Sequence, residues 1–533
     1  MTDQADDRRT GTVYLIGAGP GDPGLLTLRG AELLARAQVV VYDRLAHPDL
    51  LRHAPESAER IYVGKESSRH TLRQEEINAL LVERAKRGLT VCRLKGGDPY
   101  AFGRGGEEAL ACREAGVPFE IVPGITSAIA APAYAGIPVT HREAASSFAI
   151  VTGHEDPAKP ESRIRWEHLA HGIDTLVFLM GVENLEHIAD RLLGAGRAPS
   201  TPVALVRWGT WPAQRTLVST LGRVVDDVRQ AGLTAPAVTI VGEVVRLRQH
   251  LRWFDCRPLF GRRIVVTRAR EQASSLSDAL RALGAEPLEF PVIRIAPPRD
   301  LGNLDAALAR LASYHWVVFT SANAVAAVRG RLDALGMDAR AFAGCRIAAI
   351  GPATASALGA MGLRADFVPS RFVAEAAAEE WPDRDLAGQR VLIPRAREAR
   401  EVLPRSLEER GAAVDVVAAY ETVLDDSAAA ELRRQLRDST VDAVTFTSSS
   451  TVRNFVQCLG EDWRGLLASV PCFSIGPITS QTARELGIEP VAEAPEHTIP
   501  GLVQVLVNHF QNALSGALDP SVQSGSDSNE PDP

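Results

Sequence analysis

The chain has 533 residues, which is too many for one hydrophobic core, so two or more domains are expected. Its net charge of −8 argues against a general nucleic-acid binder, because such proteins carry a basic surface that replaces the counterions of phosphate. No apolar run reaches the roughly 18 to 20 residues that cross a bilayer, and the polar first ten residues lack an export signal. We therefore expect a cytoplasmic protein with neither membrane nor nucleic-acid partners.

Cysteine and lysine usage narrows the chemistry. The six cysteines form no CxxC pair and no cluster with histidine, so neither a disulfide framework nor a metal site is expected. Only Lys65, Lys86, Lys95 and Lys159 are lysine among 58 basic residues. A coding bias towards arginine explains most of this imbalance. Lysine, unlike arginine, can lose its proton in a suitable environment, so Lys65 and Lys95, which lie in glycine-containing motifs, become candidates for chemistry.

Short apolar, β-branched runs alternate with helix-like segments through the first half of the chain. Two such runs, at 12–19 and 37–43, flank a helix-like segment, and the rhythm continues to about residue 245. This alternation predicts an α/β domain. The sequence RWFDCRPLFGRR at 252–263 interrupts it before a new strand begins, so we place a domain boundary there.

Two glycine-rich runs, at 15–28 and 93–108, predict that backbone meets a ligand or another chain segment closely. The first contains GAGPGD at 17–22, which is similar to a dinucleotide-binding turn. That turn needs glycine where this chain has Asp22, and Pro20 removes a backbone N–H that would bind phosphate. A nicotinamide-dependent oxidoreductase is therefore a disfavoured alternative.

The motifs of the first half, taken together, resemble the tetrapyrrole methylase family, and specifically its uroporphyrinogen-III C-methyltransferases, over residues 11–255. The resemblance is carried by GAGPGDPGLLTLRG (17–30), VVYDRL (40–45), VGK (63–65), RLKGGDPYAFGRGGEE (93–108), VPGITSA (122–128), GIPVTHR (136–142), VTGH (151–154), TLVFLMG (175–181), TPVALVRWGT (201–210) and VGEVV (241–245). It implies two α/β subdomains that bind S-adenosylmethionine between them, largely through backbone groups, and a homodimer.

The resemblance also implies which residues contact the cofactor. These are Pro20, Gly96, Gly97, Asp98, Ala101, Thr126, Ser127, Met180 and Gly209. Ala101 and Ser127 depart from the commoner isoleucine and alanine, but both are expected to contribute backbone more than side chain. For Asp98 an alternative is that its carboxylate caps the following helix.

Catalytic roles follow from the same resemblance. Asp43 is the expected proton acceptor and Lys65 the expected proton donor, and the family adds two methyl groups in succession to give precorrin-2. For Asp43 the alternative is a cap at a strand end. Substrate carboxylates would suit a group of basic residues, each of which alone could equally be an ordinary surface charge: Arg93, Lys95, Arg104, His141 and Arg142.

The second half repeats itself. IVVTRAREQ at 264–272, VVFTSANAV at 317–325 and IAAIGPATA at 347–355 have counterparts in the same order at offsets of 127, 127 and 125 residues. This pattern predicts a duplicated α/β unit with two lobes. Hydroxyl and amide side chains gather at the ends of the expected strands, where α/β proteins bind ligands, although helix capping explains any one of them: Thr320, Ser321, Asn323, Thr354, Thr447, Ser448, Ser449, Ser450 and Thr479.

The motifs of this half resemble the uroporphyrinogen-III synthase family over 262–512. The signs include FTSANAV, FVPSRFVAE, LIPRAREAREVLP, VDVVAAYET and HTIPGL. The resemblance implies one lobe from 262–292 plus 422–510 and another from 293–421, whereas a simple tandem repeat would divide the chain between its two copies. It also implies cyclisation of hydroxymethylbilane without a cofactor.

Within this second half, Tyr420 matches the family's tyrosine and is expected to assist loss of the substrate hydroxyl. An aromatic core residue is the alternative for it. Substrate carboxylates would be held by hydroxyl and amide groups rather than by cations: Thr320, Ser321, Asn323, Thr354, Ser448, Ser449 and Thr479.

The whole chain is thus expected to be a bifunctional tetrapyrrole enzyme that makes uroporphyrinogen III and methylates it, feeding sirohaem or cobalamin synthesis. The alternative is a methyltransferase joined to a degenerate synthase-like binding or regulatory module. The ends, 1–10 and 515–533, have little to bury and are expected to be disordered.

Overall fold

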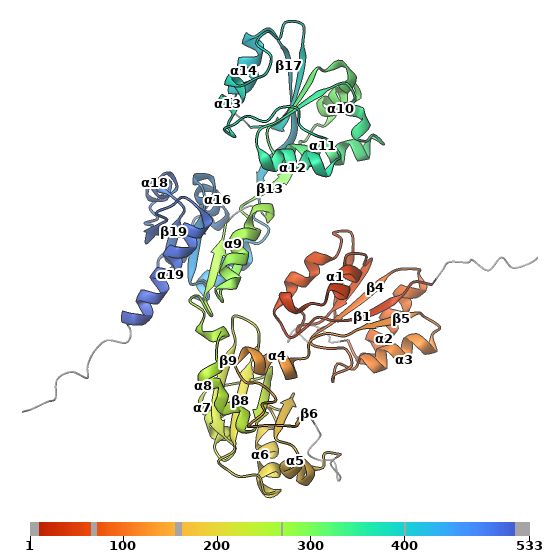
Figure 1. The fold of residues 1–533 in the computed structure, drawn as a ribbon, viewed down its shortest axis with the longest axis vertical. Helices are drawn as coiled ribbons and strands as arrows, with labels where there is room; N and C mark the ends of the chain where they lie inside the picture. Colours follow the sequence, from red (N-terminus) through yellow and green to blue (C-terminus); the bar gives the residue numbers. More distant parts are fainter. Residues whose placement is uncertain (1–9, 65–71, 155–162, 268–269, 399–400, 517–533) are drawn as a thin grey trace, which may run out of the picture. The chain divides into compact units, whose positions relative to one another are not determined.

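The structure is a computed structural model of the whole chain, and it describes residues 10–64, 72–154, 163–267, 270–398 and 401–516 (Figure 1). The chain divides into two compact units: the first runs to Arg262 and also includes Arg281–Glu286, and the second comprises the rest. The ends expected to be disordered lie outside the described residues, except residue 10 and residues 515–516, which end helix α19 (Ile499–Gly516). Within the described ranges, no helix has both the length and the apolar character to cross a membrane.

The first unit begins with a five-stranded parallel sheet. Its strands, in order across the sheet, are β3 (Glu59–Tyr62), β2 (Val39–Tyr42), β4 (Val91–Lys95), β1 (Val13–Gly17) and β5 (Phe119–Val122). Helix α1 (Leu28–Leu34) packs on one face, and α2 (Gln74–Lys86) and α3 (Gly105–Glu114) pack on the other (Figure 1). In a parallel sheet all strands end at the same edge, so the loops after β1, β2, β4 and β5 gather there.

A second sheet completes the first unit. Its strands, in spatial order, are β6 (Phe148–Thr152), β7 (Thr175–Leu179), β10 (Ala237–Val241), β8 (Pro202–Arg207) and β9 (Arg215–Thr220). Only β6 and β7 are parallel, and the remaining pairs are antiparallel. One face is covered by α5 (Trp166–Gly172), α6 (Leu185–Gly194) and α7 (Val224–Gln230), and the other by α4 (Ser127–Tyr134) and the 3₁₀ helix η3 (Glu243–Leu247).

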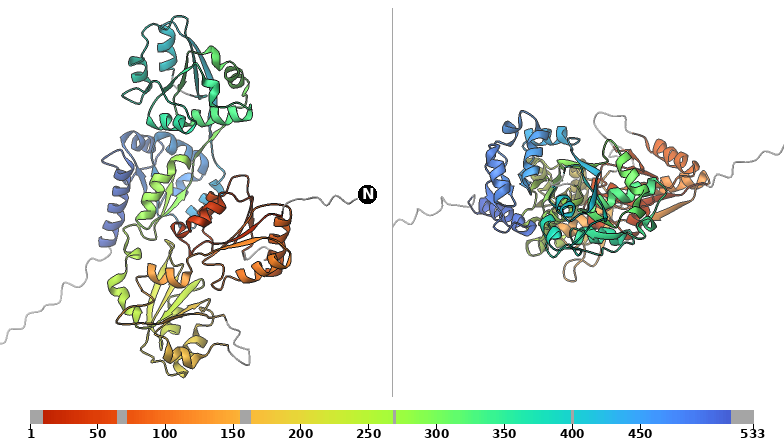
Figure 2. Two further views of the ribbon diagram at one scale, coloured as in Figure 1. Left: turned by 45° about the vertical axis from the view of Figure 1, so that its right-hand side comes forward. Right: turned by 90° about the horizontal axis from the view of Figure 1, so that it is seen from above.

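The second unit contains two further five-stranded sheets. One has the order β12 (Glu286–Glu289), β11 (Arg263–Val266), β18 (Ala443–Phe446), β19 (Cys472–Ser474) and β20 (Ala492–Glu493). The other has the order β13 (Ile293–Ala296), β17 (Ala413–Leu424), β16 (Arg390–Ala396), β14 (Trp316–Phe319) and β15 (Arg346–Ala349). The chain leaves the first of these sheets through β13 and returns through β17 (Figure 2). The expected α/β class is confirmed for both units, and so is the bilobal second half.

Helices pack on both sheets of the second unit. The first sheet carries α9 (Arg270–Ala282), α15 (Ala429–Arg437), α16 (Ser449–Leu459), α17 (Trp463–Leu467), α18 (Pro477–Glu485) and α19. The second carries α10 (Gly302–Ala309), α11 (Ala322–Ala334), α12 (Pro352–Ala360), α13 (Ala374–Glu379) and α14 (Val402–Glu409).

The sequence repeat is present in these sheets, but its two copies exchange their first strands. β11, from IVVTRA, pairs with β18 of the other copy rather than with β14, and β16, from VLIPRA, pairs with β14. Each of the two sheets therefore contains strands from both copies of the repeat. The first strand of one copy, β11 or β16, lies beside the second strand of the other copy, β18 or β14. The exchanged contact is reinforced by two buried threonines, since Thr267 Oγ1 donates to the carbonyl of Thr445 and Thr445 Oγ1 donates to the carbonyl of Val265, both at 2.8 Å.

Replacing Thr445 with valine should weaken the exchanged contact. The change removes a fully buried hydroxyl and its bond to the Val265 carbonyl at nearly constant volume, so the second unit should lose about 1 kcal/mol of unfolding free energy. Chemical denaturation followed by circular dichroism measures the loss. Thr440→Val is the control, because the exposed hydroxyl of Thr440 also donates to a carbonyl, that of Gln435. Equal effects of the two changes would contradict the role given to the buried bond.

Candidate functional site

A cavity of about 470 Å³ lies within the first unit, where the loops at the carboxyl edge of the parallel sheet meet loops of the second sheet. Its volume falls in the range of about 300 to 1,000 Å³ that is typical of small-molecule sites. Carboxyl ends of parallel strands are the usual binding edge of α/β folds. The cavity is the candidate active site of this unit.

Close backbone packing builds one wall of the cavity. Gly19 and Gly97 exchange backbone hydrogen bonds of 3.1 and 2.7 Å, which join the two glycine-rich loops directly. A Cβ built on Gly17 would lie 2.4 Å from the Cα of Gly124, so these loops meet only because they lack side chains. Gly97 has a φ of +70°, and a Cβ there would meet nothing closer than 3.9 Å, so its open side belongs to the cavity.

Asp98 holds this wall rather than lining the cavity. One carboxylate oxygen accepts hydrogen bonds from the backbone N–H groups of Tyr100 and Ala101 at 2.8 and 2.9 Å, and the other accepts from Gly124 N–H at 2.9 Å. The side chain therefore ties the GGDP loop to the loop after β5. Asp98 caps the turns that precede α3. This role is close to the helix cap that the sequence offered as the alternative to a cofactor contact.

Asp22 is the anchor of a clamp between the two sheets of the first unit. Its carboxylate accepts a hydrogen bond of 2.7 Å from the Tyr134 hydroxyl, and its backbone N–H donates to Thr210 Oγ1 at 3.0 Å. Burial and the neighbouring Asp22 carboxylate raise the pKa of Tyr134 above its ordinary value, so the hydroxyl stays a donor. The Trp211 indole N–H also donates to the carbonyl of Pro20 at 3.3 Å. Asp22, which stands where the dinucleotide-binding turn needs glycine, thus connects the two sheets of the first unit.

Strained backbone is concentrated around the cavity. Phe102, Met180 and Trp208 line it with φ values of 58°, 57° and 49°, a region that residues with side chains rarely adopt. Arg104 and Thr210, at 61° and 75°, lie within two residues of lining positions. Such strain persists where the surrounding structure over-determines the backbone, and it is typical of functional sites.

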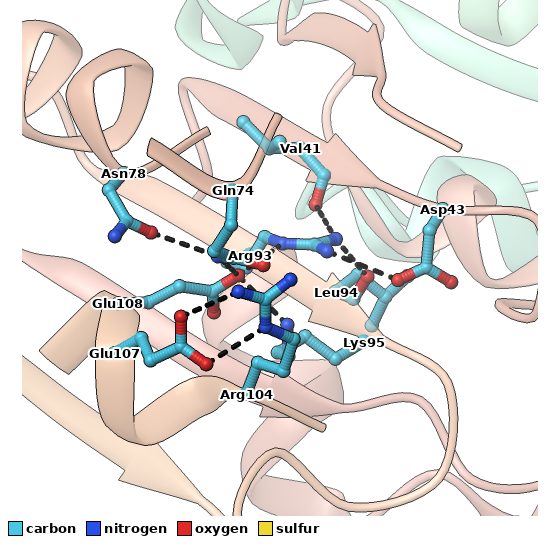
Figure 3. Close-up of polar contacts among 10 residues, drawn as sticks. All are labelled: Val41, Asp43, Gln74, Asn78, Arg93, Leu94, Lys95, Arg104, Glu107 and Glu108. Atoms are coloured by element: carbon cyan, nitrogen blue, oxygen red, sulfur yellow. Dashed lines mark hydrogen bonds and ion pairs between the residues drawn. The ribbon is translucent and has the colours of Figure 1, made fainter. Parts of the chain in front are cut away.

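Four charged side chains form a connected group that reaches the cavity wall (Figure 3). Asp43 and Lys95 line the cavity, whereas Arg93 and Glu108 are buried behind them. Arg93 Nη2 donates to Asp43 Oδ2 at 3.2 Å, and Lys95 Nζ donates to Glu108 Oε1 at 2.8 Å. Burial, and then the positive charge of Arg93, lower the pKa of Lys95.

The structure places the sequence-predicted residues as follows. Eight of the nine expected cofactor contacts line the cavity, and Asp98 supports it from behind: Pro20, Gly96, Gly97, Ala101, Thr126, Ser127, Met180 and Gly209 are the lining positions. The expected proton acceptor Asp43 also lines the cavity. The expected proton donor Lys65 lies outside the described residues.

The basic residues expected to hold substrate carboxylates are dispersed. Lys95 lines the cavity, and Arg93 is buried with all three guanidinium nitrogens engaged in hydrogen bonds. Arg104 is exposed and makes a two-point ion pair with Glu107, at 2.8 and 2.7 Å. His141 and Arg142 lie between α4 and β6, outside the cavity lining.

Sequence reasoning missed several cavity residues. They are aromatic, histidine or acidic residues that follow strand ends or loops of the two sheets: Phe102, His154, Glu183, Trp208 and Trp211. The aromatic run RWGTW at 207–211 was the available signal for two of them, because both tryptophans closely follow an apolar strand-like run, where α/β proteins bind ligands. Among the described residues, no cluster of histidine, cysteine and carboxylate groups could hold a metal ion.

In the second unit, the expected hydroxyl residues lie at strand ends and helix starts. Ser321 and Ser448 are the N-caps of α11 and α16, where they accept from the backbone N–H groups of Ala324 and Thr451. The Tyr420 hydroxyl lies 3.1 Å from Ser321 Oγ. Thr320 precedes Ser321 at the end of β14, and Asn323 is in the first turn of α11.

The remaining hydroxyls of the second unit occupy matching places in its two sheets. Thr354 and Thr479 are each the third residue of a helix, α12 or α18, and both side chains are buried. Ser449 Oγ accepts from Thr482 Oγ1 of α18 at 2.8 Å. Each of the two sheets therefore has a serine hydroxyl at a strand end, Ser321 or Ser448, and a threonine in the first turn of a helix, Thr354 or Thr479.

Comparisons with known proteins agree with this division. A sequence model of the family described as "Tetrapyrrole (Corrin/Porphyrin) Methylases" matches residues 12–225, and one described as "Uroporphyrinogen-III synthase HemD" matches residues 274–504. A protein of Ruminiclostridium josui named "Porphyrin biosynthesis protein HemD" is 39% identical over 497 residues, which cover 93% of this chain and 98% of that protein.

Other relatives cover the first unit alone. A uroporphyrinogen-III C-methyltransferase of Priestia megaterium is 55% identical over 235 residues, which cover 44% of this chain and 98% of the relative. The crystal structure of the Thermus thermophilus uroporphyrin-III C-methyl transferase, solved with S-adenyl homocysteine, is 43% identical. It covers 44% of this chain and all of that chain, with a TM-score of 0.38.

An α/β protein with a backbone-lined cavity at the carboxyl ends of its strands is of the small-molecule enzyme class. The chain belongs to the tetrapyrrole biosynthesis family that joins a tetrapyrrole methylase to a uroporphyrinogen-III synthase. The family assignment made from the motifs is confirmed for both halves.

Replacing Gly21 with alanine should disrupt the clamp at the cavity. Its Cβ would lie 1.9 Å from the Trp211 indole nitrogen, and its φ of +151° disfavours any side chain. Overpacking of this kind costs about 1 to 3 kcal/mol, so the first unit should unfold at a lower temperature in calorimetry. Gly106→Ala is the control, because a Cβ there meets nothing within 4 Å. An unchanged transition for Gly21→Ala would contradict the clamp.

Proposed function

We propose that the second unit cyclises hydroxymethylbilane to uroporphyrinogen III and that the first unit methylates this product twice, giving precorrin-2. The observation that carries the proposal is the cavity of the first unit, which combines a glycine-lined wall with the acid and the amine of Asp43 and Lys95. The matches of both units to the two families support it.

The cavity fits S-adenosylmethionine, which supplies the methyl group when it is bound. Gly96 and Gly97 line the cavity without side chains, so a ligand can approach their backbone closely, while the N–H and carbonyl of Gly97 are themselves bonded to Gly19. Apolar side chains, including Leu45, Leu179 and Val206, exclude water from the rest of the space. Such a site would bind its ligand mainly by shape and by close backbone contact, and its lining also carries the charged residues Asp43, Lys95 and Glu183.

Asp43 is suited to accept a proton. Transfer of a methyl group to a pyrrole carbon leaves a positive charge that the ring releases by losing a proton, so a nearby carboxylate assists. Asp43 lines the cavity, and its two oxygens accept from Arg93 Nη2 and from the backbone N–H of Leu45 at 3.2 and 3.1 Å. The carboxylate is therefore oriented by two donors while part of it faces the cavity.

Lys95 is suited to meet a substrate carboxylate. Lys95 lines the cavity and is buried, and its Nζ is bonded to Glu108 at 2.8 Å, so an anionic group that reaches Nζ would meet little competition from water. Arg104, His141 and Arg142 are proposed to meet carboxylates that extend beyond the cavity. Lys65 remains the proposed proton donor of the family pattern.

The second unit is proposed to act by imposing a conformation on its substrate, since ring closure needs positioning more than chemical activation. Tyr420 assists departure of the hydroxyl group, and its own hydroxyl is held near Ser321. Thr354, Ser448, Ser449 and Thr479 hold substrate carboxylates together with helix N–H groups.

The two activities should respond to different substitutions. Asp43→Asn should lower methylation by about 100-fold or more and leave cyclisation intact, whereas Tyr420→Phe should lower cyclisation and leave methylation of supplied uroporphyrinogen III intact. Product analysis by mass spectrometry and chromatography, with hydroxymethylbilane and S-adenosylmethionine as substrates, measures both.

Asp174→Asn and Tyr314→Phe are the matched controls. The Asp174 carboxylate binds the backbone of Ser146 and Ser147, and the Tyr314 hydroxyl binds Asp415, both away from the proposed catalytic groups. Loss of both activities from either test substitution would contradict independent sites. A wild-type protein that methylates but never cyclises would favour the alternative, in which the second unit is a degenerate module.

We also propose that the protein is a cytoplasmic homodimer assembled through the first unit, as the methylase resemblance implies. Sedimentation equilibrium should therefore give twice the mass of the chain, and the isolated first unit should dimerise with similar affinity. A monomer at micromolar concentration would contradict this proposal.

A further inference from the structure

The two cations of β4 lie on a face of the parallel sheet that is otherwise apolar. Side chains alternate along a strand, so Arg93 and Lys95 share the face of Val91, which packs against α2 and α3. Both side chains are almost completely buried. Burying a charge is costly unless it is paired and hydrogen-bonded, so these cations need anionic partners within the sheet and helix layer.

Glu108 of α3 supplies one partner. It is fully buried, and its Oε1 accepts from Lys95 Nζ at 2.8 Å, from Arg93 Nε at 3.2 Å and from Gln74 Nε2 at 3.3 Å (Figure 3). Within the described part of the chain, its Oε2 is buried without a hydrogen-bond partner. One carboxylate oxygen therefore binds both cations, whereas the other stays buried without a hydrogen bond, which is unfavourable for the stability of the fold.

Arg93 connects Glu108 to Asp43. Its Nε binds Glu108, its Nη2 binds Asp43 Oδ2 at 3.2 Å, and its Nη1 donates to the carbonyls of Val41 and Leu94 at 3.4 and 3.0 Å. A guanidinium with every nitrogen engaged has one orientation. Exposure falls from 26% for the Asp43 side chain to 4% for Arg93 and 0% for Glu108, so the group runs from the cavity inward.

Stability alone does not account for these four charges. Well-packed apolar residues often replace a buried ion pair without loss of stability, and the rest of this sheet face is packed in that way. The arrangement instead connects Arg93 and Glu108 to Asp43 and Lys95, which are lining residues of the cavity, although Lys95 is itself buried. The Asp43 carboxylate is held by the positive charge of Arg93, and the Lys95 ammonium group is held by the negative charge of Glu108.

We propose that Arg93 and Glu108 are positioning residues for methyl transfer: Arg93 orients the Asp43 carboxylate, and Glu108 orients the Lys95 ammonium group at the cavity wall. The inference rests on the function proposed for the first unit. It gives Arg93 a role behind the wall, in place of contact with substrate, and it gives a role to Glu108, which ends the motif at 93–108 but was assigned none from the sequence.

If Arg93 and Glu108 act on the Lys95 side chain, replacing either residue should change the pKa of Lys95. A purely structural role predicts no such change. The charged groups that face Lys95 are Arg93 on its own strand, Glu108 and Glu107 from α3, and Asp43 from the loop after β2. Arg93 lowers the pKa of Lys95, and Glu108 raises it. Removing the charge of Glu108 should therefore lower that pKa further, and removing the charge of Arg93 should raise it.

The test compares Arg93→Met and Glu108→Gln with wild type in the full chain. Misplaced catalytic groups cost about 100-fold in rate, so both variants should lower kcat for methylation by that order. Binding of S-adenosylhomocysteine, measured by calorimetry, should stay close to wild type because the glycine wall is untouched. The alkaline limb of kcat/KM for uroporphyrinogen III should move to lower pH in Glu108→Gln and to higher pH in Arg93→Met.

Arg84→Met is the matched control. Arg84 also makes a two-point ion pair, with Glu59 at 3.0 and 2.9 Å, but neither residue lines the cavity. It should retain the wild-type kcat and pH profile. If Arg93→Met does not fold, Arg93→Lys takes its place, because it keeps the charge but cannot bridge two carboxylates.

Wild-type kcat in folded Glu108→Gln and in the folded Arg93 variant, with an unshifted pH profile in Glu108→Gln, would overturn the inference while leaving the proposed function intact. A wild-type protein that transfers no methyl group would overturn the proposed function, and the positioning role with it. The two failures are distinguished by the activity of the wild type alone.

Discussion

The first unit depends on the approach of three backbone segments at the carboxyl edge of its parallel sheet. A Cβ on Gly124 would lie 2.3 Å from the carbonyl oxygen of Gly97, and one on Gly17 would lie 2.8 Å from the same atom. Only glycine permits this packing, and the resulting hydrogen bonds between Gly19 and Gly97 fix both loops. Because the loops are fixed by backbone, the cavity presents peptide groups in constant positions.

The same strand carries both the wall and the charges. β4 ends at Lys95 and continues directly into Gly96 and Gly97, so any shift that opens the glycine wall also moves the ammonium group and the guanidinium behind it. Asp98 and the Asp22 clamp restrain that shift from two further directions. The geometry of the wall and the orientation of the charged groups are therefore mechanically coupled.

Much of this unit could be predicted because its signals are local. Glycine runs at strand ends mark backbone contacts, and the positions that the methylase motifs assign to the cofactor line one cavity. The role of Glu108 could not be predicted, since an acid in the first turn of a helix is ordinary and its burial arises from tertiary packing. The partners of Arg93 within the chain could not be predicted either, because a sequence shows its charge and not its contacts.

In the second unit, the repeat was visible but its pairing was not. Each copy contains the same strand and helix signals, and nothing local in IVVTRA distinguishes β14 from β18 as its neighbour. The synthase resemblance implied lobes that differ from the division suggested by the repeat alone. Pairing between distant strands depends on the topology of the whole unit.

The exchange of first strands also sets an order of events during synthesis. β11 has β12 on one side, but its other edge is open until β18 is made, about 180 residues later. At ribosomal rates of about 5 to 20 residues per second this interval is on the order of ten to forty seconds. The core around Val265, Phe290 and Val292 cannot close before then, because its remaining members follow residue 424. The intervening sheet of β13–β17 is complete earlier, so the nascent chain has an unpaired apolar strand edge on β11 until β18 is made.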